Sequence, residues 1–174
     1  PFLARFYEDP EAYSFQTQIF FLLSRYRQQL DLSQRDLFAQ SVVSDYIFAK
    51  DQIFATINLA EDELTLYRAL VPLMEARLVP PDLVVYLQAP VTTLMQRIQR
   101  RGKPEERHIT TDYLNQLSDA YARYFTSYDR TPLLIINTSQ VNLADNQLHL
   151  EDILERIEGH RQGRSFYNPV AELL

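Results

Sequence analysis

Two short apolar segments, each followed by a helical pattern, constrain the fold of this chain more than any other feature. Residues 83–87 (Leu-Val-Val-Tyr-Leu) and 133–137 (Leu-Leu-Ile-Ile-Asn) are short and rich in branched apolar side chains. Runs of this kind are typical of strands that are buried on both faces of a sheet. Because such strands alternate with helical patterns here, the sequence predicts an α/β fold in which helices flank a parallel sheet.

The remaining elements follow from apolar spacing and from helix-breaking residues. A further strand is expected over residues 37–45, which end at Asp45. Helices are expected over residues 11–30, 47–57, 61–77, 91–101, 111–128 and 151–160. Asp9-Pro10 favours the start of the first helix, and Pro80-Pro81 follows the end of the third. The tail, residues 162–174, has no clear pattern, and a length of 174 residues predicts a single domain, 1–174.

The distribution of charge favours a small anionic ligand over nucleic acid. The net charge of -6 argues against a protein that coats nucleic acid, since such a protein needs a broad basic face. Five cationic side chains nevertheless fall within the eleven residues 97–107, beside the first of only three glycines, Gly102. The segment 97–109 therefore predicts a mobile lid that closes over phosphates.

Composition also bears on the compartment. No apolar run approaches 18 residues, so no membrane span is expected. The chain has no cysteine, which fits a cytoplasmic protein.

Four residues outside the lid are candidates for ligand binding. Asp45 ends a predicted strand, where parallel sheets bind ligands, so it could hold a metal ion or a substrate hydroxyl; capping of the next helix is the alternative. Gln18 and Arg25 lie seven residues apart and hence on one helical face, among apolar neighbours. A guanidinium in that setting needs a partner, which Asp51 could supply, and a purely structural salt bridge is the alternative.

The predicted lid contains further candidates for phosphate binding. The glycine-rich phosphate loop, by contrast, is missing from residues 1–174. Arg97 and Arg101 lie four residues apart on one helical face, where solvation at the surface is the alternative to phosphate binding. Every glycine lies at or beyond position 102, so residues 1–174 contain no glycine-rich phosphate loop.

Three segments of the sequence resemble the deoxyribonucleoside kinase family. Residues 6–18 (FYEDPEAYSFQTQ), followed by 23–28 (LSRYRQ), resemble the substrate helix of that family, and Asp45 followed by Asp51 resembles its strand-end segment. Residues 97–109, followed by Asp112-Tyr113-Leu114, resemble its lid. The resemblance runs from residue 1 to about residue 157. It implies a P-loop kinase fold and transfer of the γ-phosphate of ATP, with Mg²⁺, to the 5′-hydroxyl of a deoxynucleoside, with purines preferred.

The resemblance also implies a role for each candidate residue. Gln18 would bind the base in a bidentate manner, and the Arg25–Asp51 pair would contact another edge of the base. Tyr7 and Glu106 would hold the 3′-hydroxyl. The triphosphate and the transferring phosphoryl group would meet three cations, Arg97, Arg101 and Lys103, and Arg101 would also act in catalysis. Asp45 would act in catalysis and as a ligand of Mg²⁺. A homodimer formed by the two long helices 11–30 and 61–77 is expected, as in the family.

The sequence departs from the family pattern in three ways. The phosphate loop and the glutamate that acts as base are not present in residues 1–174, so the chain as it stands is expected to be inactive while the complete protein is active. Asp45 is followed by Tyr46-Ile47 instead of Arg-Ser, and we expect Lys50 to replace the missing arginine. Two alternatives stay open. They are a nucleotide kinase similar to thymidylate kinase, whose strand end residues 43–46 also resemble, and a catalytically inactive module for nucleoside binding or dimerisation.

Overall fold

The computed structural model describes residues 2–35, 41–141 and 147–169, and its contacts divide the chain into two compact units. The first, which we call the helical unit, comprises residues 1–79 and 102–124. The second, which we call the sheet unit, comprises residues 80–101 and 125–174.

The helical unit is built from the elements α1 (Leu3–Glu8), α2 (Pro10–Arg35), α3 (Lys50–Asn58), α4 (Glu61–Glu75), the short 3₁₀ helix η1 (Pro104–Glu106) and α6 (Thr111–Thr126), up to Tyr124. Two of its helices, α2 and α6, begin where a capping side chain accepts a free backbone N–H group. Asp9 Oδ1 accepts the N–H of Ala12 at 3.2 Å, directly before Pro10 in the first turn of α2. Thr110 Oγ1 likewise accepts the N–H of Tyr113 at 3.1 Å at the start of α6. These caps explain why the starts of both helices could be predicted within one residue.

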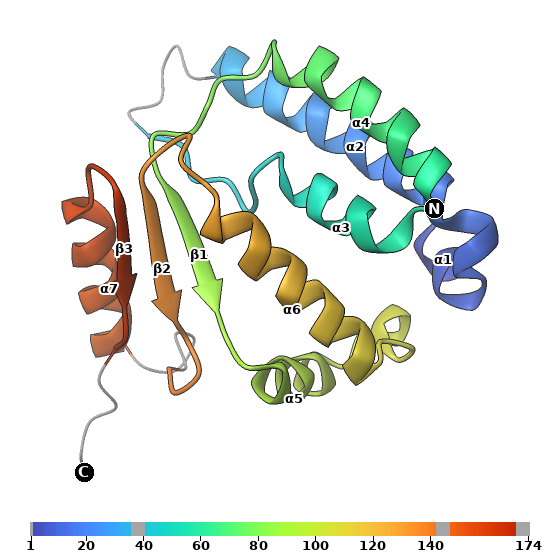
Figure 1. The fold of residues 1–174 in the computed structure, drawn as a ribbon. Helices are drawn as coiled ribbons and strands as arrows, with labels where there is room; N and C mark the ends of the chain where they lie inside the picture. Colours follow the sequence, from blue (N-terminus) through green and yellow to red (C-terminus); the bar gives the residue numbers. More distant parts are fainter. Residues whose placement is uncertain (1, 36–40, 142–146, 170–174) are drawn as a thin grey trace. The chain divides into compact units, whose positions relative to one another are not determined.

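An apolar cluster holds α2, α3 and α4 together. Leu22 from α2, Ala55 from α3, and Tyr67 and Val71 from α4 are buried against one another and against Phe48, which precedes α3. Figure 1 shows α2 and α4 running side by side. The long helix α2 therefore presents one continuous buried face, and the polar residues on that face are buried with it.

The sheet unit contains three parallel strands in the order β1-β2-β3, with α5 and α7 beside them (Figure 1). The strands are β1 (Val84–Gln88), β2 (Leu133–Asn137) and β3 (Arg164–Tyr167), and the helices are α5 (Val91–Arg101) and α7 (Gln147–Gly159). Val84 lies opposite Leu133, which in turn lies opposite Arg164, so the strands start at one edge. The α/β fold with a parallel sheet is confirmed.

The core of the sheet unit lies under α7. Leu134 and Ile136 of β2 pack with Val141 and with Ile153 of α7. Four of the five residues of β2 are buried, as expected for a central strand of a parallel sheet.

The strand that we expected over residues 37–45 is wrong in its described part. Residues 41–44 have no regular structure, Asp45 lies in a bend, and the side chain of Val43 is 96% exposed. Residues 36–40 lie outside the described part. The three described strands pair only with one another, so residues 41–45 have no ladder to join, and β-branched composition alone does not make a strand.

Three elements were not predicted from the sequence: α1, β3 and the short 3₁₀ helix η1 within residues 97–109. Helix α1 has only six residues, too few to show a helical period. Strand β3 lies inside the unassigned tail; its Arg-Ser-Phe-Tyr sequence is mostly exposed and carries no apolar run. No helix in the described ranges is both long and apolar enough to cross a membrane.

The core of the helical unit generates a stability prediction. Leu22 is fully buried whereas the adjacent Leu23 is 39% exposed on the same helix. Leu22→Ala is expected to lower the free energy of unfolding by about 2–5 kcal/mol, because it removes buried surface and leaves a cavity. Leu23→Ala, the matched control, should cost less than about 1 kcal/mol. Urea denaturation measures both, and equal costs would contradict the packing described here.

Candidate functional site

A polar cluster lies within the apolar core of the helical unit. It comprises Thr17, Gln18 and Arg25 of α2, Asp51 of α3 and Tyr67 of α4. Gln18 is 3% exposed and Asp51 is 1% exposed. The helical spacing explains the placement, because Gln18 and Arg25 flank Leu22 on the buried face of α2, and Asp51 lies in the first turn of α3.

Arg25 and Asp51 form the ion pair that the sequence suggested. Arg25 Nη1 donates to Asp51 Oδ1, and both side chains are largely buried. A buried pair of opposite charges costs desolvation energy that its own attraction only partly returns. The contact itself therefore does not distinguish a structural salt bridge from a ligand site.

Tyr46 completes the surroundings of the ion pair. The guanidinium of Arg25 lies 4.2 Å from the centroid of the Tyr46 ring, and Lys50 Nζ lies 4.6 Å from the same centroid. The backbone of Tyr46 has φ of 135°, in a region that side chains other than glycine rarely adopt. Strained residues of this kind cluster at functional sites. The sequence singled out position 46 only as a departure from the family pattern, and the cation–π role of its ring was missed.

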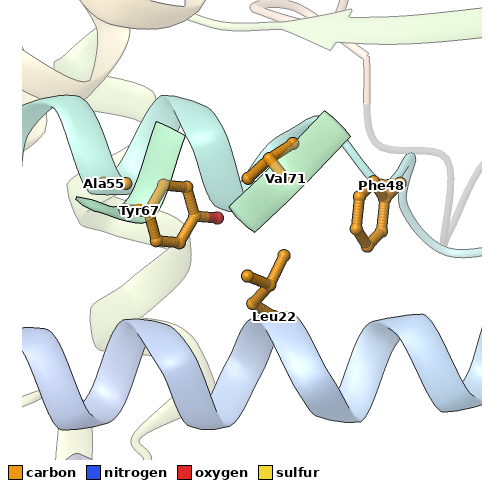
Figure 2. Packing of buried hydrophobic residues seen from close by; sticks show 5 residues of the cluster. All are labelled: Leu22, Phe48, Ala55, Tyr67 and Val71. Atoms are coloured by element: carbon orange, nitrogen blue, oxygen red, sulfur yellow. The ribbon is translucent and has the colours of Figure 1, made fainter. Parts of the chain in front are cut away.

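Five polar atoms in the cluster have no hydrogen-bond partner within the described protein. They are Thr17 Oγ1, Gln18 Oε1, Arg25 Nε, Asp51 Oδ2 and the Tyr67 hydroxyl. Figure 2 shows that this hydroxyl points into the core. An unsatisfied buried polar group costs about 1–3 kcal/mol, so such a concentration is expected only where a ligand or water supplies the partners. The cluster thus offers hydrogen-bond donors and acceptors that a polar ligand or water could pair with.

Burial also changes the protonation of the cluster. Desolvation raises the pKa of Asp51 to about 6, although Arg25 and Lys50 act in the opposite direction. Desolvation, and then the nearby Asp51 carboxylate, raise the pKa of Tyr67 above its ordinary value, while Arg25 lowers it. The Tyr67 hydroxyl consequently keeps its proton at neutral pH.

The other predicted residues of the helical unit lie on its outer elements. Tyr7 belongs to α1 and Glu106 to η1, and α1 contacts η1. Asp45 and Lys103 are exposed, while Lys50 is partly buried in the first turn of α3. No group of three metal-ligating side chains (His, Cys, Asp or Glu) occurs among the residues that the structure describes.

Two predicted cations belong to the sheet unit, and one of them is anchored. Arg97 Nη2 donates to the carbonyl oxygens of Thr138 at 2.6 Å and Val141 at 3.2 Å, and Nη1 donates to Thr138 Oγ1 at 3.0 Å. Thr138 Oγ1 in turn donates to the carbonyl of Gln88 at 3.0 Å. Arg97 thus fixes α5 at the carboxyl ends of β1 and β2, whereas Arg101 is exposed. Sequence reasoning missed Thr138, which lies beyond the last residue of a predicted strand.

The sequence is similar to a known protein family and to several of its members. The sequence model of the family "Deoxynucleoside kinase" matches residues 1–161. The deoxyguanosine kinase of Bacillus subtilis is 36% identical over 162 residues, which cover 92% of this chain and 78% of that protein. The deoxyadenosine/deoxycytidine kinase of the same organism is 24% identical, over 90% of this chain and 75% of that protein.

The fold is also similar to that of solved deoxyadenosine kinase structures. A structure of deoxyadenosine kinase from M. mycoides with bound dATP superposes with a TM-score of 0.75 at 19% identity, over 91% of this chain and 81% of that one. The chain has the architecture of the P-loop kinases of this class. It belongs to the deoxynucleoside kinase family, and the deoxynucleoside kinases that it resembles are phosphotransferases. This membership favours the deoxynucleoside kinase interpretation over the alternative of a thymidylate-kinase-like enzyme.

The raised pKa of Asp51 predicts a pH dependence of stability. The folded state binds the Asp51 proton more tightly than the unfolded state, in which the pKa is about 3.9. The stability contribution of this group is therefore fully present below about pH 4 and is lost as the pH rises through about 6. Asp51→Asn should remove this fall, which amounts to at most about 3 kcal/mol from about 1.4 kcal/mol per pKa unit.

Urea denaturation between pH 4 and pH 7 measures this effect as the difference between variant and wild-type profiles. Asp31→Asn, which removes an exposed carboxylate from α2, is the control and should follow the wild-type profile. A parallel pair of profiles for wild type and Asp51→Asn would show that Asp51 titrates normally.

Proposed function

We propose that this protein, in its complete form, transfers the γ-phosphoryl group of ATP to the 5′-hydroxyl of a deoxynucleoside, and that it prefers purines. The polar cluster is the observation that carries this proposal, since it offers a base several hydrogen-bonding atoms that have no partner in the protein. Within a family of deoxynucleoside kinases, the base is the flat polar molecule that such a cluster fits.

The chemistry of the free atoms suits a purine. Gln18 Oε1 and Asp51 Oδ2 are acceptors, Arg25 Nε is a donor, and the Tyr67 hydroxyl can be either. Purine edges carry both donors and acceptors, and guanine has amino and ring N–H donors next to a carbonyl acceptor. The Bacillus subtilis relative with 36% identity is a deoxyguanosine kinase, which makes deoxyguanosine the first substrate to test.

The remaining substrate contacts are assigned as the family resemblance implies. Tyr7 and Glu106 hold the 3′-hydroxyl, and the contact between α1 and η1 supports their cooperation. The exposed cations Arg101 and Lys103 meet the triphosphate of ATP, as does Arg97, whose bonds to the segment after β2 set its position. Cations placed around a transferring phosphoryl group stabilise the charge that spreads over its oxygens.

Asp45 and Lys50 complete the proposed catalytic set. Mg²⁺ in phosphoryl-transfer sites takes one or two carboxylates and completes its shell with water and phosphate oxygens. The exposed carboxylate of Asp45 fits that role, and bound Mg²⁺ would neutralise charge on the phosphates. Lys50 is held beside the Tyr46 ring and takes the place of the arginine that the family carries after the strand.

The proposal includes a homodimer through the long helices α2 and α4. Leu23 of α2 and Leu66 and Leu73 of α4 are large apolar side chains that are 39–71% exposed. A second copy of the chain would cover them. We place the protein in the cytoplasm, in keeping with its lack of cysteine.

The base-binding role of Gln18 can be separated from any role in stability. Gln18→Leu keeps the volume of the side chain and removes an unsatisfied buried group, so the free energy of unfolding should stay within about 1 kcal/mol or increase. Binding of deoxyguanosine should weaken at least tenfold, since each base contact contributes about 1.4 kcal/mol or more. Isothermal titration calorimetry measures binding, and urea denaturation measures stability.

Gln16→Leu is the matched control, because Gln16 is exposed two residues earlier on the same helix. It should leave binding unchanged. Unaltered deoxyguanosine binding in Gln18→Leu would exclude the cluster as the base site.

Turnover distinguishes a kinase from an inactive binding module. The protein expressed from the complete reading frame that contains these residues should phosphorylate deoxyguanosine with ATP and Mg²⁺. Lys50→Ala should lower kcat by about 10²-fold or more, as expected for loss of a transition-state cation. Arg27→Ala, which removes an exposed cation from α2, should leave kcat unchanged. Binding without any turnover would identify the inactive module, and an unchanged kcat in Lys50→Ala would remove Lys50 from the catalytic set.

The proposed dimer can be tested by placing a charge in its interface. Leu73→Glu places a charge in the proposed interface and should convert a dimer to a monomer in sedimentation velocity. Leu154→Glu is the control, because Leu154 is also an exposed leucine (46%, against 71% for Leu73) but belongs to α7. A wild-type protein that sediments as a monomer would refute the dimer.

A further inference from the structure

The side chain of Tyr67 is the most deeply enclosed member of the polar cluster. Tyr67 belongs to α4 and is fully buried, at 0% exposure, with Leu22, Ala55 and Val71 of the same apolar cluster (Figure 2). The side chain of Arg25, by contrast, is 12% exposed. A nucleobase that approaches the ion pair from solvent therefore meets Arg25 first, and the Tyr67 hydroxyl is placed to act on the pair from the core.

The ion pair leaves one oxygen of Asp51 available to this hydroxyl. Arg25 Nη1 donates to Oδ1, whereas Oδ2 has no hydrogen-bond partner in the part of the chain that the structure describes, and neither has the Tyr67 hydroxyl. The two groups nevertheless interact electrostatically, because the pKa of Tyr67 is raised by burial and then by the Asp51 carboxylate. An internal water molecule typically joins buried polar groups that lie near one another but not in direct contact.

The protonation of the two groups sets the direction of such a link. Tyr67 keeps its proton, so its hydroxyl can donate, whereas an ionised Asp51 carboxylate can only accept. A water molecule between them accepts from the phenol and donates to Oδ2. A hydrogen bond donated to a carboxylate favours its charged form. The link from Tyr67 therefore lowers the affinity of Asp51 for a proton.

Asp51 lies where a small change in proton affinity matters. The charged and titratable groups that act on it or on Tyr67 come from three packed helices: Arg25 from α2, Lys50 and Asp51 from α3, and Tyr67 from α4. Desolvation raises the pKa of Asp51 to about 6, although Arg25 and Lys50 lower it. A carboxyl group that gains a proton loses acceptor capacity toward a nucleobase.

We propose that Tyr67 is a positioning residue of the nucleobase site: through one internal water molecule its hydroxyl donates to Asp51 Oδ2 and keeps Asp51 ionised for recognition of the base. The inference rests on the proposed function, because the base is the ligand that Asp51 contacts there. Tyr67 acts through Asp51 without touching the base. Its effect is therefore confined to the pH range in which Asp51 titrates.

Tyr67→Phe tests the link in the ligand-free protein, because it removes the hydroxyl and keeps the ring. Carboxyl ¹³C NMR follows the titration of Asp51, and its midpoint should move to a higher pH than in the wild type. Tyr26→Phe is the matched control, because Tyr26 packs against the same apolar cluster and makes the same change without touching the ion pair in the described contacts. It should leave the midpoint unchanged. An unchanged midpoint in Tyr67→Phe, or an equal movement in both variants, overturns the proposal.

Binding of deoxyguanosine distinguishes positioning from direct contact. In the protein expressed from the complete reading frame, Tyr67→Phe should weaken binding about threefold or more at about pH 6, since less Asp51 is ionised, and binding should return to the wild-type value at about pH 8. Isothermal titration calorimetry at both pH values measures this. A loss that persists at the higher pH would show a direct contact with the base and overturn the positioning role.

Gln18→Leu separates this inference from the proposed function. Weakened binding in Gln18→Leu together with wild-type binding in Tyr67→Phe at about pH 6 overturns the role of Tyr67 alone. Unaltered binding in Gln18→Leu removes the base site itself, whereas the Asp51 titration, which is measured without nucleoside, still decides whether Tyr67 and Asp51 are linked.

Discussion

The buried contact between Arg25 and Asp51 is the constraint around which the helical unit is organised. It joins α2 to α3 in the middle of an apolar core, where two charges are costly and remain only if each neutralises the other. The raised pKa of Asp51 shows that burial exceeds the attraction of Arg25. A fold that needed only stability would be served better by two apolar side chains of the same volume. The unpartnered polar atoms beside the pair, and not the pair itself, therefore support the proposed binding role.

The residues around the ion pair also lower the stability of the ligand-free protein. The strained backbone of Tyr46 places one aromatic ring against two cations, and the free atoms of Thr17, Gln18 and Tyr67 lie in the same core. Each feature lowers the stability of the ligand-free protein. In the proposed function, a base that satisfied these atoms would recover the deficit as binding energy, and intrinsic stability would be exchanged for affinity.

The parts of the fold with a strong local signal could be predicted from the sequence. Residues 133–137 form β2 as predicted, and the Asp9-Pro10 pair begins α2, because both signals are local. The strand predicted up to Asp45 failed because pairing depends on a neighbouring strand, which composition does not show. β3 was missed because an exposed edge strand needs no apolar run.

The candidate site could likewise be predicted only where its signals are local in the sequence. The face shared by Gln18 and Arg25 follows from helical spacing, and the partnership with Asp51 follows from the cost of a buried charge. The unsatisfied atoms and the position of the Tyr46 ring depend on how three helices pack, and no local pattern shows them. Arg97 has the spacing of a lid cation, yet its partners lie more than 40 residues away in sequence.

The anchoring of Arg97 limits where the proposed lid, residues 97–109, can hinge. Three hydrogen bonds tie this residue to the segment that follows β2, so the last turn of α5 cannot swing freely with the residues beyond it. The next residue with unusual backbone freedom is Gly102, whose φ is 64°. A closing movement of residues 103–109 would thus pivot at Gly102 and leave α5 stationary. The cations of the lid would then divide into a fixed group before the pivot and a travelling group after it.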